Sequence, residues 1–157
     1  MRALLLLVPP LLLAACTPTG PAAPAVPAVA ENEVVPIGQV QGTGLRSPLE
    51  GRVVTIEAVV VAPMGGLGGV FVQSLVPDDD PTTSEGLFLP RERDAQPRLK
   101  AGDTLRATGR VAETGDDGAT LTSLQLQSLE LTGRAPVLPQ PLAAAPPSAG
   151  DWERYEG

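Results

Sequence analysis

Apolar and polar residues alternate with a period of two in the central part of the chain, which is the pattern of half-buried β-strands. The clearest case is residues 68–89, GGVFVQSLVPDDDPTTSEGLFL. Here two valines alternate with Phe71 and Gln73, and two leucines flank Phe88. An acidic loop that contains proline separates the two segments. This stretch therefore predicts two short strands joined by a loop.

The same alternation predicts further extended segments along the chain. They lie at residues 35–41, 52–62, 104–112 and 119–132. In the last segment the apolar parity changes between Leu126 and Leu129, which predicts a bulge near Gln127 and Ser128. Five or six short strands with glycine-rich turns in about 100 residues are typical of a small closed barrel. We therefore expect an all-β, OB-fold-like barrel, with a β-sandwich as the alternative.

The apolar faces of these segments define the predicted core. Its members are Val54, Ile56, Val60, Val72, Leu87, Leu105, Val111 and Leu126. With the aliphatic residues inside, Phe71, Gln73 and Phe88 lie on the outer face of their two strands, where OB folds bind bases. The alternative is that both rings belong to the core and the valines face outward.

Basic residues could supply contacts to phosphate. Arg106 and Arg110 share the polar face of residues 104–112, and together with the outer-face residues Phe71, Gln73 and Phe88 they complete a candidate nucleic-acid-binding set. A second basic cluster contains Arg91, Arg93, Arg98 and Lys100. Ordinary surface charge is the alternative interpretation of both groups.

The N-terminus predicts export. Arg2 precedes an apolar segment, residues 3–13, which is too short to span a bilayer. The following sequence, Leu-Ala-Ala-Cys16, resembles the lipobox of bacterial lipoproteins. This resemblance implies removal of residues 1–15, lipidation of Cys16, and attachment to the outer membrane or cell surface on the extracytoplasmic side of the envelope. An ordinary secretory signal with a chance cysteine is the alternative.

Composition divides the rest of the chain. Residues 16–33 are rich in Pro and Ala and predict a disordered tether, residues 34–138 the barrel domain, and residues 139–157 a second Pro/Ala linker with a C-terminal segment. Loss of residues 1–15 would remove Arg2, which leaves 10 basic against 18 acidic residues and a net charge of −8. Such a charge repels nucleic acid at long range, so any binding must be local.

Several segments together resemble the OB-fold module of bacterial extracellular nucleases, which carry an endonuclease/exonuclease/phosphatase catalytic domain further along. The matching segments are IGQVQGTGLRSPLEG (37–51), VTIEAVV (54–60), GGLGGVFVQS (65–74), PDDDPTTSEGLFL (77–89), GDTLRATGRVAE (102–113) and DWERYEG (151–157). The resemblance implies a nucleic-acid ligand and a catalytic partner domain, which would follow Gly157.

The residues themselves predict no catalysis. The chain has no His, its only Asn is Asn32, and no acidic residue sits in an apolar context that would raise its pKa. Asp78, Asp79, Asp80 and Glu85 lack the spacing of a calcium loop, so we expect neither metal nor cofactor.

Two functions remain open at this point. The first is a lipid-anchored module that binds single-stranded nucleic acid or positions a separate nuclease catalytic domain. The alternative is a structural or protein-interaction lipoprotein without nucleic-acid binding. The resemblance favours the first, whereas the negative charge and the scarcity of aromatic residues favour the second.

Overall fold

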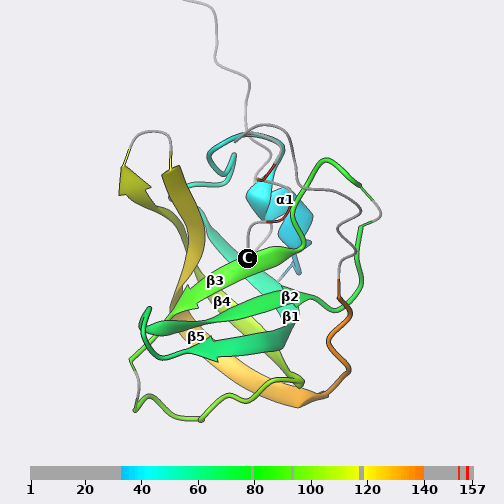
Figure 1. The fold of residues 1–157 in the computed structure, drawn as a ribbon, viewed down its shortest axis with the longest axis vertical. Coiled ribbons are helices and arrows are strands. Elements are labelled where there is room, and N and C mark those ends of the chain that lie inside the picture. Colours follow the sequence, from blue (N-terminus) through cyan, green and yellow to red (C-terminus); the bar gives the residue numbers. More distant parts are fainter. Residues whose placement is uncertain are drawn as a thin grey trace, which may run out of the picture.

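The computed structural model describes residues 33–78, 80–92, 94–116 and 119–139, together with Trp152 and Tyr155. Within these residues five strands form one closed barrel in the order β1-β2-β3-β5-β4 (Figure 1). The strands are β1 (Val53–Met64), β2 (Gly69–Ser74), β3 (Gly86–Pro90), β4 (Asp103–Asp116) and β5 (Ala119–Arg134). Neighbouring strands are antiparallel except for β3 and β5, which are parallel. The predicted small OB-fold-like barrel is confirmed, and the β-sandwich alternative is wrong.

The barrel interior is filled by the aliphatic residues that the alternation placed there. Of the predicted core residues, seven are at most 2% exposed: Val54, Ile56, Val60, Val72, Leu87, Leu105 and Val111. Leu126 is only partly buried and packs against the edge of this core. Leu124, two residues earlier on β5, is fully buried instead.

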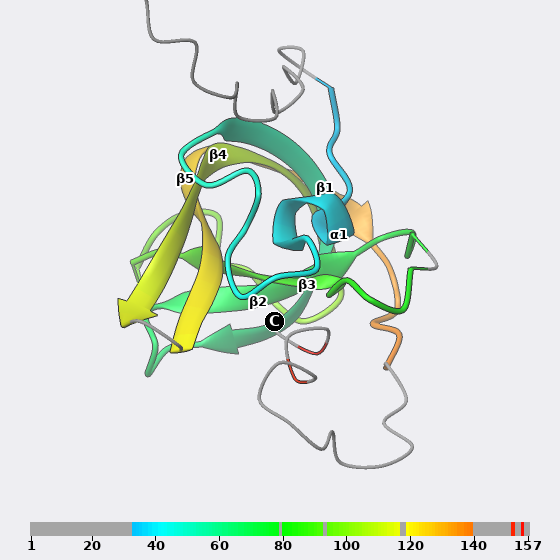
Figure 2. The ribbon, with the colours of Figure 1, turned by 90° about the horizontal axis from the view of Figure 1, so that it is seen from above.

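Residues 35–41 do not form the extended segment that the sequence predicted. Only Val34 makes an isolated parallel bridge, to Thr55, and the chain then forms the short helix α1 (Ile37–Gln41). Ile37, Val40 and Gln41 are buried, with the three- and four-residue spacing of one helical face. Figure 2 shows α1 over one end of the barrel, so the helix closes that end with two core side chains.

The predicted bulge in β5 is confirmed. Thr108 pairs with Ser128 and the next residue, Gly109, pairs with Leu126, so Gln127 is the extra residue on β5. The inserted residue keeps both Leu126 and Leu129 on the inner side of the barrel despite their changed parity. A second irregularity on β5 leaves Thr132 unpaired between Leu131 and Gly133, and a third leaves Val61 unpaired on β1.

The N-terminal predictions fall outside the described residues. Cys16, the signal segment and the proposed tether up to residue 32 all precede the described part of the chain. In that part, no helix has both the length and the apolar character needed to cross a membrane.

Candidate functional site

Phe71 and Phe88 form an aromatic pair on the outer face of the barrel. They are direct register partners on β2 and β3, and their ring centroids lie 5.0 Å apart with the planes tilted by 51°. Their sequence neighbours Val70, Val72 and Leu89 belong to the aliphatic core instead. The rings therefore lie on the opposite side of their strands from the aliphatic core, and the alternative with the valines outside is wrong.

Phe88 is nevertheless buried, with only 6% of its surface exposed, because its ring fills space above a glycine. A Cβ placed on Gly69 would lie only 2.8 Å from Phe88 Cε2 and 2.5 Å from the carbonyl oxygen of Leu89. Phe71, the register partner of Phe88, packs against this ring and remains half-buried. Phe71 is thus the ring that a ligand could reach, and Phe88 is the ring that supports it.

Gln73, the third predicted outer-face residue, binds the protein's own chain. Its Nε2 donates a hydrogen bond of 2.9 Å to the carbonyl oxygen of Leu138. The segment after β5 is also fixed where the backbone N–H of Ala135 donates to Gly102 O over 2.9 Å. Residues 135–139 therefore lie against the outer face at the Gln73 end, and Val59, the register partner of Gln73, is only 2% exposed. Phe71, two residues earlier on β2, is half-buried.

Arg106 and Arg110 lie away from the aromatic pair. Arg106 is the register partner of Glu57 and forms an ion pair with it, with Nη1 3.1 Å from Oε1, while Arg110 donates to the carbonyl oxygen of Gly51. Phe71 is paired with Ala62, further along β1. At about 3.3 Å per residue, Glu57 and Ala62 are separated by roughly 16 Å along the strand. The structure does not bring these arginines and the rings into one compact site.

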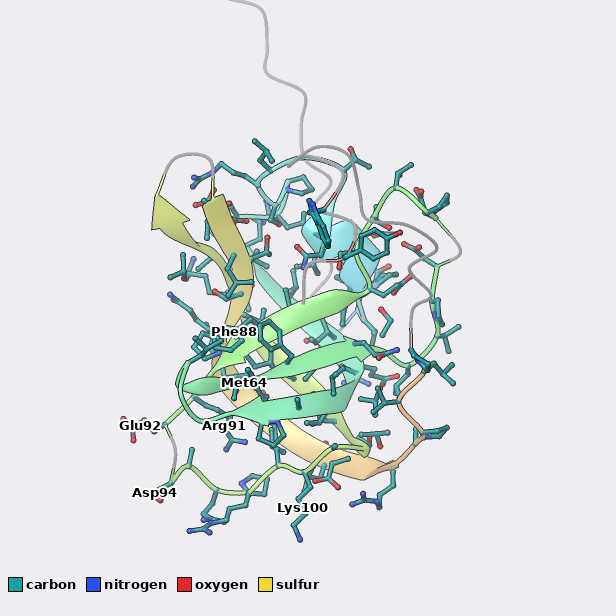
Figure 3. The ribbon with its side chains drawn as sticks, in the orientation of Figure 1. Met64, Phe88, Arg91, Glu92, Asp94 and Lys100 are labelled. Carbon is teal, nitrogen blue, oxygen red and sulfur yellow. The ribbon has the colours of Figure 1, made fainter. Side chains whose placement is uncertain are left out.

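A pocket lined in part by Gly69, the residue under the Phe88 ring, contains a different arginine. It has a volume of about 320 Å³ and lies between the β1–β2 turn and the connection from β3 to β4. Arg91 follows β3 directly and lines this pocket, which we call the Arg91 pocket. In the view of Figure 3, Met64, Phe88 and Arg91 project onto the same part of the barrel, and Met64 is the register partner of Gly69. Arg98 and Leu99 line the pocket from the far end of the connection.

The environment of Arg91 is partly apolar. Its Nη1 donates to the carbonyl oxygen of Pro97 over 3.0 Å, and its backbone N–H donates to Gly68 O over 2.9 Å. Burial lowers the pKa of the Arg91 guanidinium from its usual value. The sequence groups Arg91 with Arg98 and Lys100, but it gives no signal that the connection from β3 to β4 forms a pocket with the β1–β2 turn. Arg93 lies outside the described residues.

The acidic loop between β2 and β3 uses its carboxylates to hold its own backbone. Asp80 Oδ1 accepts from the Thr82 backbone N–H at 2.8 Å and from Thr82 Oγ1 at 2.6 Å, and these bonds lower the pKa of Asp80. Asp78 accepts from the N–H of Asp80, and Glu85 accepts from the N–H of Asp78. Among the residues that the structure describes, no group of three or more potential ligands could hold a metal ion.

No family model matches this chain, and no curated protein is similar to it. The resemblance to the nuclease modules therefore rests on the sequence motifs alone.

Proposed function

We propose that this barrel is a non-catalytic module that binds single-stranded nucleic acid across the outer face of β2 and β3. The observation that carries the proposal is the Phe71–Phe88 pair. In this pair Phe71 packs against the Phe88 ring and remains half-buried on the outer face of the sheet. Aromatic rings on sheet surfaces stack bases of any sequence, and this face of OB-like barrels is the one that holds oligonucleotides.

The distribution of charge supports a local contact with nucleic acid near the aromatic pair rather than attraction by the protein as a whole. The chain carries a formal net charge of −7, which opposes long-range attraction of a polyanion. The Arg91 pocket, however, contains a cation and is lined by Gly69, the residue under the Phe88 ring. Binding should therefore be modest in affinity and sensitive to salt.

Lipidation of Cys16 would place this module on the extracytoplasmic side of the cell envelope, in the outer membrane or at the cell surface. A separate nuclease catalytic domain is the partner that the motif resemblance suggests. In that arrangement the barrel would hold the strand while the partner cleaves it.

The test is a titration of labelled single-stranded DNA against wild-type protein and Phe71→Ala at low and moderate salt. Loss of one stacked base should weaken binding by about 1–3 kcal/mol, which is roughly a factor of ten to a hundred. Phe71→Tyr keeps a ring and is the matched control, so it should bind like the wild type. Equal affinity of wild type and Phe71→Ala, with both variants folded, would refute stacking on this ring.

A second candidate function is docking of a protein. Met64, at the end of β1, and Leu67, in the turn that follows, are 38% and 59% exposed and give this end of the barrel an apolar surface. An apolar surface on an acidic protein suits a protein partner better than a polyanion. Absence of nucleic-acid binding by the wild type at low salt would favour this candidate.

A further inference from the structure

Arg91 is a partly buried cation for which the described residues supply no carboxylate partner. The ion pairs among these residues involve Arg46, Arg98, Arg106 and Arg134. With the residues that the structure describes, the Arg91 side chain makes one hydrogen bond, to the neutral carbonyl of Pro97. A guanidinium has five N–H donors and stays protonated at any physiological pH, so most of its donors remain available.

Partial burial of this cation favours an anion as its ligand. Burial removes water from the charged group, as the lowered pKa of Arg91 reflects. A bound anion would replace the lost hydration with charge-assisted hydrogen bonds, and a guanidinium binds phosphate with two parallel donors. The pocket of about 320 Å³ is large enough for such a group.

The pocket and the surroundings of the aromatic pair share one residue, Gly69. This residue lines the pocket, and the Phe88 ring lies directly over it. Phe71 packs against the same ring, with the two centroids 5.0 Å apart. A single strand with one base stacked on Phe71 would therefore carry its backbone toward Arg91.

We propose that the Arg91 pocket binds one backbone phosphate of the strand whose base stacks on Phe71. This inference rests on the proposed function and specifies which cation meets the phosphate. It replaces Arg106 and Arg110 in that role, because those side chains lie elsewhere on β4 and already contact Glu57 and Gly51.

The acidic residues at the pocket do not exclude a phosphate. Asp94 lies 3.9 Å from Arg98, and the two side chains are 90% and 74% exposed. Exposed pairs of this kind are worth about 0–1 kcal/mol and are screened by salt. Arg98 can therefore exchange this weak partner for a phosphate, and Glu92 is exposed to solvent at the same rim.

The experiment compares Arg91→Gln with Arg110→Gln in the full-length protein, using fluorescence anisotropy of a labelled single-stranded oligonucleotide over a range of salt concentrations. Both variants lose one positive charge, so they match in net charge. Arg91→Gln should weaken binding about tenfold for all sequences alike and reduce the slope of log K against log salt by about 0.7, the value for one phosphate on a single strand. Arg110→Gln should keep the wild-type affinity and slope.

Each other result has a defined meaning. If the wild type binds but Arg91→Gln behaves like it, the phosphate assignment is overturned while the proposed function stands. Equal losses in both variants would also overturn it, because the attraction would then be diffuse. If the wild type does not bind at all, the proposed function fails and this inference fails with it.

A second measurement avoids any loss of folding in the variant. Oligonucleotides with one uncharged methylphosphonate linkage, placed at each position in turn, are bound to wild-type protein. One position should weaken binding about tenfold. This position effect should become smaller in Arg91→Lys, which keeps the charge but not the paired donors, and should disappear in Arg91→Gln. A uniform effect at all positions would contradict a phosphate pocket.

Discussion

Replacement of Gly109 by alanine should destabilise the barrel through a clash between two backbones. Gly109 lies on the inner side of β4, opposite the bulge in β5. An added Cβ would meet the carbonyl oxygen of Gln125 and would lie 2.9 Å from Gln125 C and 2.9 Å from Leu124 Cγ. The first two atoms belong to the β5 backbone and cannot turn away as a flexible side chain could. The two strands must therefore separate locally.

Two destabilising contributions and one stabilising contribution set the expected change in the free energy of unfolding. Overpacking of a filled core costs about 1–3 kcal/mol. Local separation of the strands weakens about one ladder hydrogen bond, which is worth about 1 kcal/mol. Alanine in a strand gains about 0.5–1 kcal/mol over glycine from chain entropy. The net loss in the free energy of unfolding should be about 2 kcal/mol.

Urea unfolding followed by circular dichroism measures this loss. With a denaturant dependence of about 1–3 kcal/mol per molar urea, the midpoint should fall by about 1 M. The control is Gly66→Ala, the same chemical change in the β1–β2 turn, where no atom lies within 4 Å of the added Cβ. This control should stay within about 0.5 kcal/mol of the wild type. Equal stability of the two variants would show that β4 and β5 do not approach as described.

Two further predictions concern the core and the anchor. Ile56 is fully buried on β1, so Ile56→Ala should cost about 2–5 kcal/mol in the same assay, and a loss under about 0.5 kcal/mol would mean that the faces of β1 are reversed. Mass spectrometry of the membrane fraction should show an acylated N-terminal Cys16; a soluble secreted form with a free thiol would rule out the anchor.

The strands and their inner faces could be predicted because a period of two is a local signal. Val54, Ile56 and Val60 lie inside the barrel because their even spacing puts them on one face of the strand. The bulge at Gln127 could also be predicted, from the change of apolar parity along β5. The helix α1 was missed because its five residues are too few to show a helical period. Ile37 and Val40 are buried in it through tertiary contacts with the barrel end.

The candidate site was predictable only in part. Parity placed Phe71 and Phe88 on one outer face, and the register confirms that they are partners. Parity also placed Arg106 on the outer side of its strand. Parity does not say how far along the barrel a residue lies, however, and it is this distance along β1 that separates Arg106 from the rings. The position of Arg91 in its pocket depends on the path of the irregular connection between β3 and β4. No repeating pattern in the sequence encodes that path.

The two bulges of β5 have a consequence for the behaviour of the protein in solution. In the described part of the chain, β5 pairs with β3 only through Ser123, so residues 125–134 pair with β4 along one edge and leave the other edge unpaired. A long open edge is a template on which another chain can add a strand and begin to aggregate. The extra residues Gln127 and Thr132 interrupt that edge and twist it, which breaks the run of regularly spaced backbone groups. The irregularities that fit β5 around the core thereby also protect the barrel from pairing with its own copies.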